Sequence, residues 1–100
     1  MPSLHQLQQY SDMKEAKRKA ISYLGSPVNM LVSTRDSHKY MIQNPHTGRW
    51  IHFGAMGYED YTKHRDEDRR QRYLKRATAI KGDWKNNKYS PNNLSINILW

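Results

Sequence analysis

Residues 39–54 read KYMIQNPHTGRWIHFG, which is two apolar runs on either side of a turn. The runs are Lys39–Gln43 and Arg49–Phe53, and each is short and rich in aromatic or β-branched residues, as strands are. Between them, Pro45 fixes its own φ and Gly48 can adopt the positive φ that tight turns need. The stretch therefore predicts an antiparallel β-hairpin.

The hairpin is predicted to offer one apolar face to the rest of the domain. Tyr40 and Ile42 alternate with their neighbours in the first run, and Ile51 and Phe53 do so in the second. Because successive side chains of a strand point to opposite faces, these four can form one surface for a helix. Residues 28–32 are apolar and partly β-branched, and they predict a third strand beside the hairpin.

Helical spacing marks a segment on each side of the predicted sheet. Before the sheet, Ser11 can cap a helix that Gly25 ends. The apolar positions of this helix recur every three or four residues and are Met13, Ala16, Ala20 and Tyr23. After the sheet, a longer helix opens at Asp60 or Tyr61 and runs to about Ile80. Its acidic residues come first and its basic residues follow, the order that a helix dipole favours.

The end of the chain is different in kind. An Asn- and Lys-rich loop precedes a short apolar segment that contains Ile96, Ile98 and Trp100. Two interpretations stay open. As an extended arm, this segment would anchor the protein in a pocket on another subunit; alternatively, the same side chains close the core of their own domain.

Together these elements predict a single α+β domain in three parts. They are an N-terminal helical segment (1–27), a small α+β core (28–82) and an extended C-terminal arm with an apolar anchor (83–100). In the central part, a two- or three-stranded antiparallel meander carries the long helix packed on it. The predicted core residues are Tyr40, Ile42, Ile51, Phe53, Tyr73, Ala77 and Ile80.

The composition indicates a thin core. Leu, Ile, Val and Phe together number only 16 in 100 residues, the net charge is +8 and the mean hydropathy is −1.07. This balance is typical of disordered chains. Three Trp and seven Tyr offset it, since each buried aromatic removes about 150–250 Å² from water. We therefore expect a domain of marginal stability that neighbouring subunits help to order.

The composition and the spacing of residues also exclude several classes of protein. No run of about 18 apolar residues exists, so a transmembrane span is not expected. The absence of Cys excludes disulfides, thiol nucleophiles and Cys-ligated zinc. The five histidines lack metal-site spacing, so we expect neither a metal nor a cofactor. They are His5, His38, His46, His52 and His64.

The predicted long helix carries a row of arginines. Arg65, Arg69, Arg72 and Arg76 are spaced so that they lie within an arc of about 60° around an ideal helix. Such a row can grip phosphates, because each guanidinium can donate to two oxygens at once. The alternative is that acidic residues of the same helix neutralise the row and leave a solvated face.

The hypothesis that the protein is an enzyme has less support than the hypothesis of phosphate binding. A nuclease needs a phosphate clamp, an activator of the nucleophile and usually a carboxylate in one cleft. Tyr40, Tyr58, Arg65 and Glu67 supply these residue types, but a basic chain contains them by chance. We therefore expect no catalytic residues and no enzymatic activity.

Interleaved aromatic and basic residues suggest one more binding mode. Lys39 precedes Tyr40 and Arg49 precedes Trp50, an arrangement that could stack the bases of a single strand. In a chain so poor in aliphatic residues, however, the aromatics are needed inside, and we expect them in the core.

Five stretches of the chain resemble a family of small basic uncharacterised proteins of large nucleocytoplasmic DNA viruses that infect algae and protists. They lie at 39–41 (KYM), 51–55 (IHFGA), 57–64 (GYEDYTKH), 69–77 (RRQRYLKRA) and 94–100 (LS through LW). The likeness covers residues 30–100. The resemblance implies that the protein belongs to such a virus. It implies no enzymatic reaction, because the family has no known activity.

The resemblance leads us to expect a non-enzymatic structural component of a virus particle. Specifically, we expect a minor capsid protein that bridges jelly-roll capsomers beneath the shell, located in the virion and assembled in the cytoplasm of the host. Its partners would be capsid proteins, and its charge would face acidic capsid surfaces, anionic membrane lipid or packaged DNA. The alternative is a DNA- or RNA-binding protein that uses the arginine row, and a nuclease is the third hypothesis.

Overall fold

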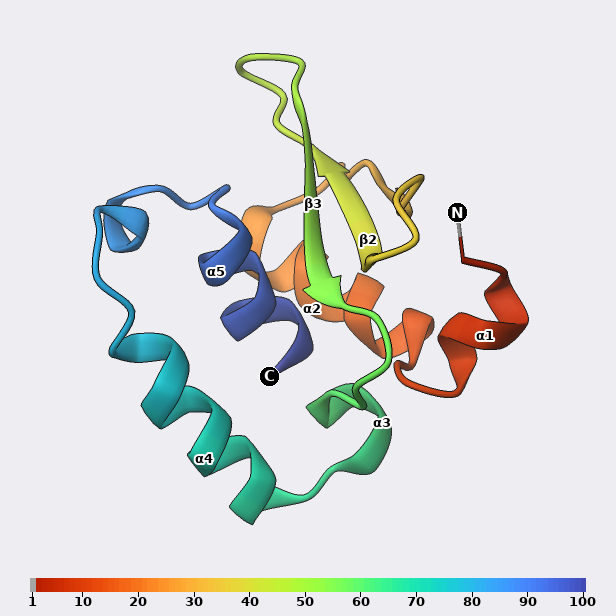
Figure 1. The fold of residues 1–100 in the computed structure, drawn as a ribbon. Coiled ribbons are helices and arrows are strands. Elements are labelled where there is room, and N and C mark those ends of the chain that lie inside the picture. Colours follow the sequence, from red (N-terminus) through yellow and green to blue (C-terminus); the bar gives the residue numbers. More distant parts are fainter. Residues whose placement is uncertain (1) are drawn as a thin grey trace.

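The computed structural model describes residues 2–100 and has the predicted α+β class. Two helices precede a three-stranded antiparallel sheet and further helices follow it (Figure 1). In chain order the elements are α1 (Leu4–Gln8), α2 (Met13–Leu24), β1 (Met30–Val32), β2 (His38–Gln43), β3 (Trp50–Ala55), α3 (Tyr61–His64), α4 (Glu67–Thr78), η1 (Trp84–Asn86), α5 (Pro91–Leu94) and η2 (Ser95–Leu99).

The predicted hairpin is confirmed as β2 and β3. In its register Tyr40 lies opposite Phe53 and Ile42 lies opposite Ile51, with the Tyr40 and Phe53 rings 5.9 Å apart. The third strand exists as well, and β1 pairs with β2 so that Met30 lies opposite Ile42. The sheet order is β1-β2-β3, a meander.

Helix α2 also forms where it was predicted, with a different cap. Asp12 caps it by accepting a hydrogen bond from the backbone N–H of Glu15 at 3.2 Å. Ser11, the predicted cap, is instead buried and bonded to Tyr40. Ala16 and Ala20 form the buried face, and their small side chains let η2 pack closely against α2.

The predicted long helix is wrong, because the chain breaks it into α3 and α4. Arg65 adopts a left-handed conformation with φ of 53° and ends α3. Asp66 then caps α4 by accepting hydrogen bonds from the N–H groups of Asp68 and Arg69. An Asp competes for helix N–H groups from outside the helix, which is why the periodic pattern does not continue through this point.

The C-terminal part is helical, not the extended arm that the sequence suggested. Ser90 accepts a hydrogen bond from the N–H of Asn93 and caps α5, and Pro91 occupies the first turn, where it needs no N–H partner. Helix η2 follows without a break and has the wider turn of a π-helix. Figure 1 shows this blue segment lying against β3 and α2, inside the domain.

Most predicted core residues lie in the core. Tyr40, Ile42, Phe53 and Ala77 are buried, and Ile51 and Tyr73 are half-buried. Ile80 was predicted wrongly: it lies beyond the end of α4 and is 53 % exposed. The C-terminal helices supply the apolar side chains that the sheet lacks, since Leu94, Ile98 and Leu99 are all buried. Of the two interpretations of the C-terminal segment, the structure agrees with the second, in which its side chains close the core of their own domain.

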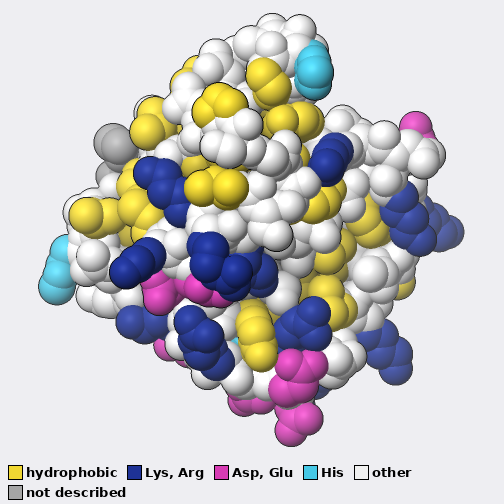
Figure 2. Space-filling view, turned by 180° about the vertical axis from the view of Figure 1, so that it is seen from behind, with side chains coloured by type: hydrophobic (Ala, Val, Ile, Leu, Met, Phe, Trp, Pro, Cys, Tyr) yellow, Lys and Arg dark blue, Asp and Glu magenta, His cyan; other side chains and the backbone are white. Residues whose placement is uncertain are grey.

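One face of the surface has mixed charge. Figure 2 shows Lys and Arg side chains across it with Asp and Glu side chains directly beside them. Two ion pairs, Arg18–Glu15 at 2.5 Å and Arg70–Glu67 at 3.1 Å, each join residues one turn apart on a helix. Exposed pairs of this kind contribute little to stability, but they neutralise the charges involved.

Gly54 in β3 allows the sheet and the C-terminal helices to meet. Its φ is 80°, and a Cβ built at this position would lie 2.7 Å from Cδ1 of Leu99. It would also lie 3.3 Å from two side-chain carbons of Lys39. The position therefore requires Gly for both its conformation and its closeness to Leu99.

Gly54→Ala is expected to lower the free energy of unfolding by about 2–5 kcal/mol, from backbone strain together with overpacking. Gly48→Ala is the matched control, because its φ is 75° and nothing lies within 4 Å of its Cβ position. That variant should lose about 1–3 kcal/mol from strain alone. Urea unfolding followed by tryptophan fluorescence measures both, and equal losses would contradict the close approach of Leu99.

Candidate functional site: an arginine-lined groove

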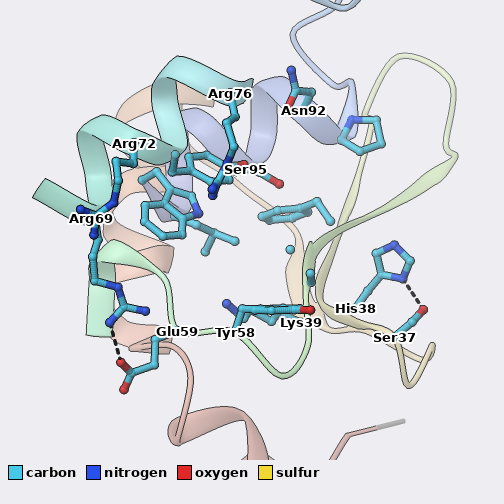
Figure 3. A pocket seen from close by; sticks show the side chains of 17 residues that line it. Ser37, His38, Lys39, Tyr58, Glu59, Arg69, Arg72, Arg76, Asn92 and Ser95 are labelled. Carbon is cyan, nitrogen blue, oxygen red and sulfur yellow. Dashed lines mark hydrogen bonds and ion pairs between the residues drawn. The ribbon is translucent and has the colours of Figure 1, made fainter. Parts of the chain in front are cut away.

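An open cavity of about 760 Å³ lies between the hairpin, α4 and the C-terminal helices. We call it the arginine groove, because Arg69, Arg72 and Arg76 of α4 line one side of it (Figure 3). Tyr58 and Lys39 lie across from them, and Phe53, Tyr73, Leu99 and Trp100 contribute apolar surface. The remaining lining residues are Ser37, His38, Gly54, Ala55, Glu59, Pro91, Asn92 and Ser95.

Helix α4 places three of the four predicted arginines together. Steps of three and four residues rise about 4.5 and 6 Å along a helix, so the three guanidinium groups follow one another along the groove. Arg65 does not join them, because it lies before the start of α4 in the left-handed connection. It lines a separate hollow with Arg18 and Lys19 instead, and the prediction of a four-membered row is wrong in this respect.

The charge of the groove is only partly neutralised. Glu59 is the one acidic side chain lining it within the described residues, and it pairs with Arg69 at 3.2 Å. Across residues 2–100, Arg72 and Arg76 form no ion pair. Two exposed guanidinium groups on neighbouring turns therefore face the cavity without a counter-ion from the protein.

Trp100, predicted as part of an anchor, is held within the domain. Its ring stacks on Tyr73 with centroids 4.1 Å apart, and its main-chain oxygen accepts a hydrogen bond from Nε of Arg70 at 2.8 Å. The ring of His64 lies 5.2 Å away, and burial lowers the pKa of this imidazole. Of the other two anchor residues, Ile98 is buried and Ile96 is half-buried.

Tyr58 is the groove residue that sequence reasoning placed in the wrong context. It lies in the connection between β3 and α3 and is 72 % exposed. The sequence places Tyr58 only among four candidate residues of a nuclease, and the fold does not bring these four together. Tyr40 is in the core, whereas Arg65 and Glu67 line the separate hollow beside α2. The one local signal for Tyr58 was its position directly after Gly57 in a short connector.

A buried ion pair positions the connection that carries Tyr58 and Glu59. Nζ of Lys39 donates to Oδ2 of Asp60 at 3.0 Å, and both side chains are almost completely buried. Burial lowers the pKa of Lys39, and the charge of Asp60 opposes this shift. The next residues before Asp60 are Glu59 and Tyr58, so the pair fixes this side of the groove.

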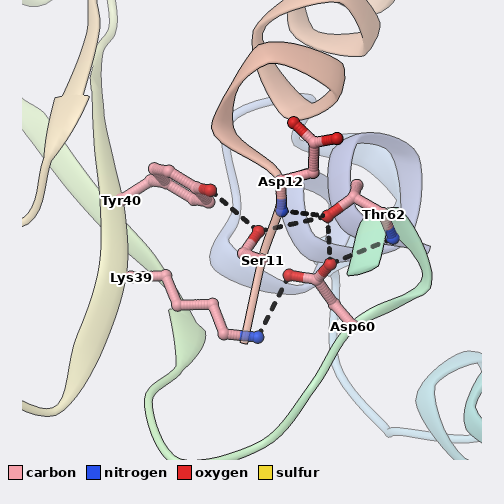
Figure 4. A network of polar contacts seen from close by, with 6 residues as sticks. All are labelled: Ser11, Asp12, Lys39, Tyr40, Asp60 and Thr62. Carbon is pink, nitrogen blue, oxygen red and sulfur yellow. Dashed lines mark hydrogen bonds and ion pairs between the residues drawn. The ribbon is translucent and has the colours of Figure 1, made fainter. Parts of the chain in front are cut away.

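Hydroxyl groups extend the ion pair into a network (Figure 4). The hydroxyl and the backbone N–H of Thr62 both donate to Oδ1 of Asp60. Oγ1 of Thr62 accepts from the N–H of Asp12 at 2.9 Å and lies 3.2 Å from Oγ of Ser11. Tyr40 donates to Oγ of Ser11 at 2.8 Å, and burial raises the pKa of its phenol. The network thus joins β2, the start of α2 and the start of α3.

Two kinds of feature are absent from the described part of the chain. Among residues 2–100, no helix combines the length and the apolar character needed to cross a lipid bilayer. In that same part of the chain, no three His, Asp or Glu side chains gather where they could hold a metal ion.

The fold and the groove define a small basic α+β protein with an arginine-lined surface hollow. The chain belongs to DUF5754, a family of unknown function, whose model matches residues 28–77. The match covers the whole sheet and α4 as far as Ala77, and therefore includes the three arginines of the groove. No curated protein and no solved structure matches the chain. The resemblance to viral proteins stays a prediction.

Lys39→Met is expected to lower the free energy of unfolding by about 3–5 kcal/mol, because it leaves the buried carboxylate of Asp60 without its cation. Adding Asp60→Asn to this variant removes the unpaired charge and should recover part of the loss. Urea unfolding of the two variants and the wild type measures both effects. A loss below about 1 kcal/mol in Lys39→Met, the value of an exposed pair, would contradict a buried ion pair.

Proposed function

We propose that this protein is a non-catalytic nucleic-acid-binding protein that holds phosphate groups in the arginine groove. The observation that carries the proposal is that Arg72 and Arg76 face an open cavity without an ion pair in the described chain. Guanidinium groups bind phosphate oxygens in pairs, and phosphate contacts supply most of the affinity of non-specific nucleic-acid binding.

The distribution of charge supports the groove over the rest of the surface. Elsewhere, Arg18 and Arg70 are paired with acids on their own helices, and the exposed Arg35 and Arg49 lie in separate loops of the sheet and not side by side. The net charge of +8 adds a long-range attraction for any polyanion. In the groove, unpaired guanidinium groups can then make direct contacts with the phosphates.

The double variant Arg72→Glu with Arg76→Glu is expected to lower affinity for nucleic acid at least tenfold and to flatten its salt dependence. Each lost phosphate contact reduces the slope of log K against log salt by about 0.7–0.9. Fluorescence anisotropy with a dye-labelled oligonucleotide at several salt concentrations measures both quantities.

The control carries Lys14→Glu and Lys17→Glu, two exposed positions on α2 with the same change of charge. It should lose only the long-range part of the attraction. Equal losses in the two double variants would show that net charge binds the oligonucleotide and that the groove does not.

A structural role in a large DNA virus particle is the second candidate. The observation that favours it is exposed apolar surface on the sheet, where Leu31 of β1 is 47 % exposed and Trp50 of β3 is 37 % exposed. Such side chains are typical of contacts with other proteins, here capsid proteins that the chain would bridge. The C-terminal segment no longer supports this role, because it packs inside its own domain.

For this candidate, the protein is expected in purified virus particles at a fixed ratio to the capsomers, and a high-salt wash should not release it. Apolar contacts survive such a wash, whereas charge contacts between exposed groups are screened. Quantitative mass spectrometry of washed particles measures the ratio. Complete release by salt would contradict a bridging structural protein.

A further inference from the structure

The groove suits one form of nucleic acid better than the other. Resting on the proposed function, we infer that it takes a single strand, with the bases stacking on Tyr58 and the phosphates lying along Arg72 and Arg76. Three observations carry this inference: the direction of the arginines, the free aromatic ring across from them, and the shape of the cavity.

Arg69 and Arg76 face the groove, and Arg72 lies at its edge, where it also borders the outer side of α4. The hollow on the outer side is lined by Gln71, Leu74, Lys75 and Thr78 together with Arg72, so it holds two basic residues. A helix that enters the major groove of a duplex presents its outward residues to base edges and phosphates. A duplex lying against the outer side of α4 would meet Arg72 and Lys75, whereas a strand in the groove meets Arg69, Arg72 and Arg76.

Tyr58 offers the aromatic surface that a single strand uses. It is the most exposed of the large apolar or aromatic side chains in the described chain, at 72 %. Its ring contacts no other described aromatic ring. Figure 3 places it across the cavity from Arg69, Arg72 and Arg76. Proteins that bind single strands combine a basic track for the backbone with aromatic rings on which bases stack.

The other Phe, Tyr and Trp residues that line the groove are already engaged, since Phe53 is buried and Tyr73 stacks on Trp100. Tyr40 is fully buried as well. Trp50 is partly exposed, but it lies outside the residues that line the groove. The stacking surface is therefore Tyr58, not the Lys39-Tyr40 or Arg49-Trp50 pairs that the sequence drew attention to.

The volume of the cavity and the residues of its walls suit one strand. It holds about 760 Å³, is open to solvent, and has basic side chains on one side and an exposed ring on the other. The bases of a duplex are paired and stacked inside the helix, so none of them can reach Tyr58. A flexible single strand can enter the hollow with its phosphates and bases turned to opposite walls.

The test compares two dye-labelled probes on the full chain: an oligothymidylate of about 15 nucleotides and a duplex of equal length. The wild type should bind the single strand at least tenfold more tightly. Tyr58→Ala should weaken single-strand binding on the order of tenfold and leave duplex binding unchanged. Tyr58→Phe keeps the ring and should bind like the wild type.

Trp50→Ala is the matched aromatic control, since it removes an exposed ring outside the groove and should not alter binding. Because Tyr58 is exposed, its variants should melt at the same temperature as the wild type. Equal or tighter binding of the duplex, or an unchanged affinity in Tyr58→Ala, would overturn the inference.

The double variant Arg72→Glu with Arg76→Glu distinguishes a failure of this inference from a failure of the proposed function. If it binds both probes as well as the wild type does, the groove is not the binding site and the proposed function fails too. If it loses both probes while Tyr58→Ala loses neither, phosphate binding stands and only the single-strand inference falls.

Discussion

The buried ion pair between Lys39 and Asp60 holds together parts of the chain that are far apart in sequence. Removing two charges from water is costly, and the cost is offset only when each charge has a full set of partners. Asp60 has them, since Lys39 and two groups of Thr62 all donate to its carboxylate. The segments at residues 11–12, 39–40 and 60–62 must therefore meet in one arrangement. That arrangement sets the position of Tyr58 and Glu59 beside the sheet.

The C-terminal helices solve a second problem, the shortage of aliphatic side chains. The sheet and α2 bury few large apolar groups of their own, and Ala16 and Ala20 leave room beside α2. Leu94, Ile98 and Leu99 occupy this room, and Gly54 lets Leu99 approach the sheet. The apolar end thus stabilises its own domain, because burial of such side chains is the main favourable contribution to folding. The expectation that a neighbouring subunit must supply a pocket for it loses its basis.

Local signals explain what the sequence could predict. The hairpin follows from alternation and an Asn-Pro-His-Thr-Gly turn, both of which act within a few residues. The burial of Lys39 could not be predicted from local signals, because its partner Asp60 is 21 residues away. Alternation alone assigns Lys39 to the polar face of the sheet. The break at Asp66 was missed because helical periodicity takes no account of a competing cap. Ser90 followed by Pro91 was a readable helix start, and it would have predicted α5 in place of an extended arm.

The candidate site, too, could be predicted only in part from local sequence patterns. Periodicity placed Arg69, Arg72 and Arg76 together, but only the fold reveals which side of α4 faces a cavity and that Tyr58 lies across from it. The positions three and four residues from Arg76 hold no acid, and Asp68 forms no ion pair with Arg72. Like charges on neighbouring turns repel, so the fold gains nothing from this arrangement. The convergence of these side chains on one hollow is the reason for proposing that an anionic partner binds between them.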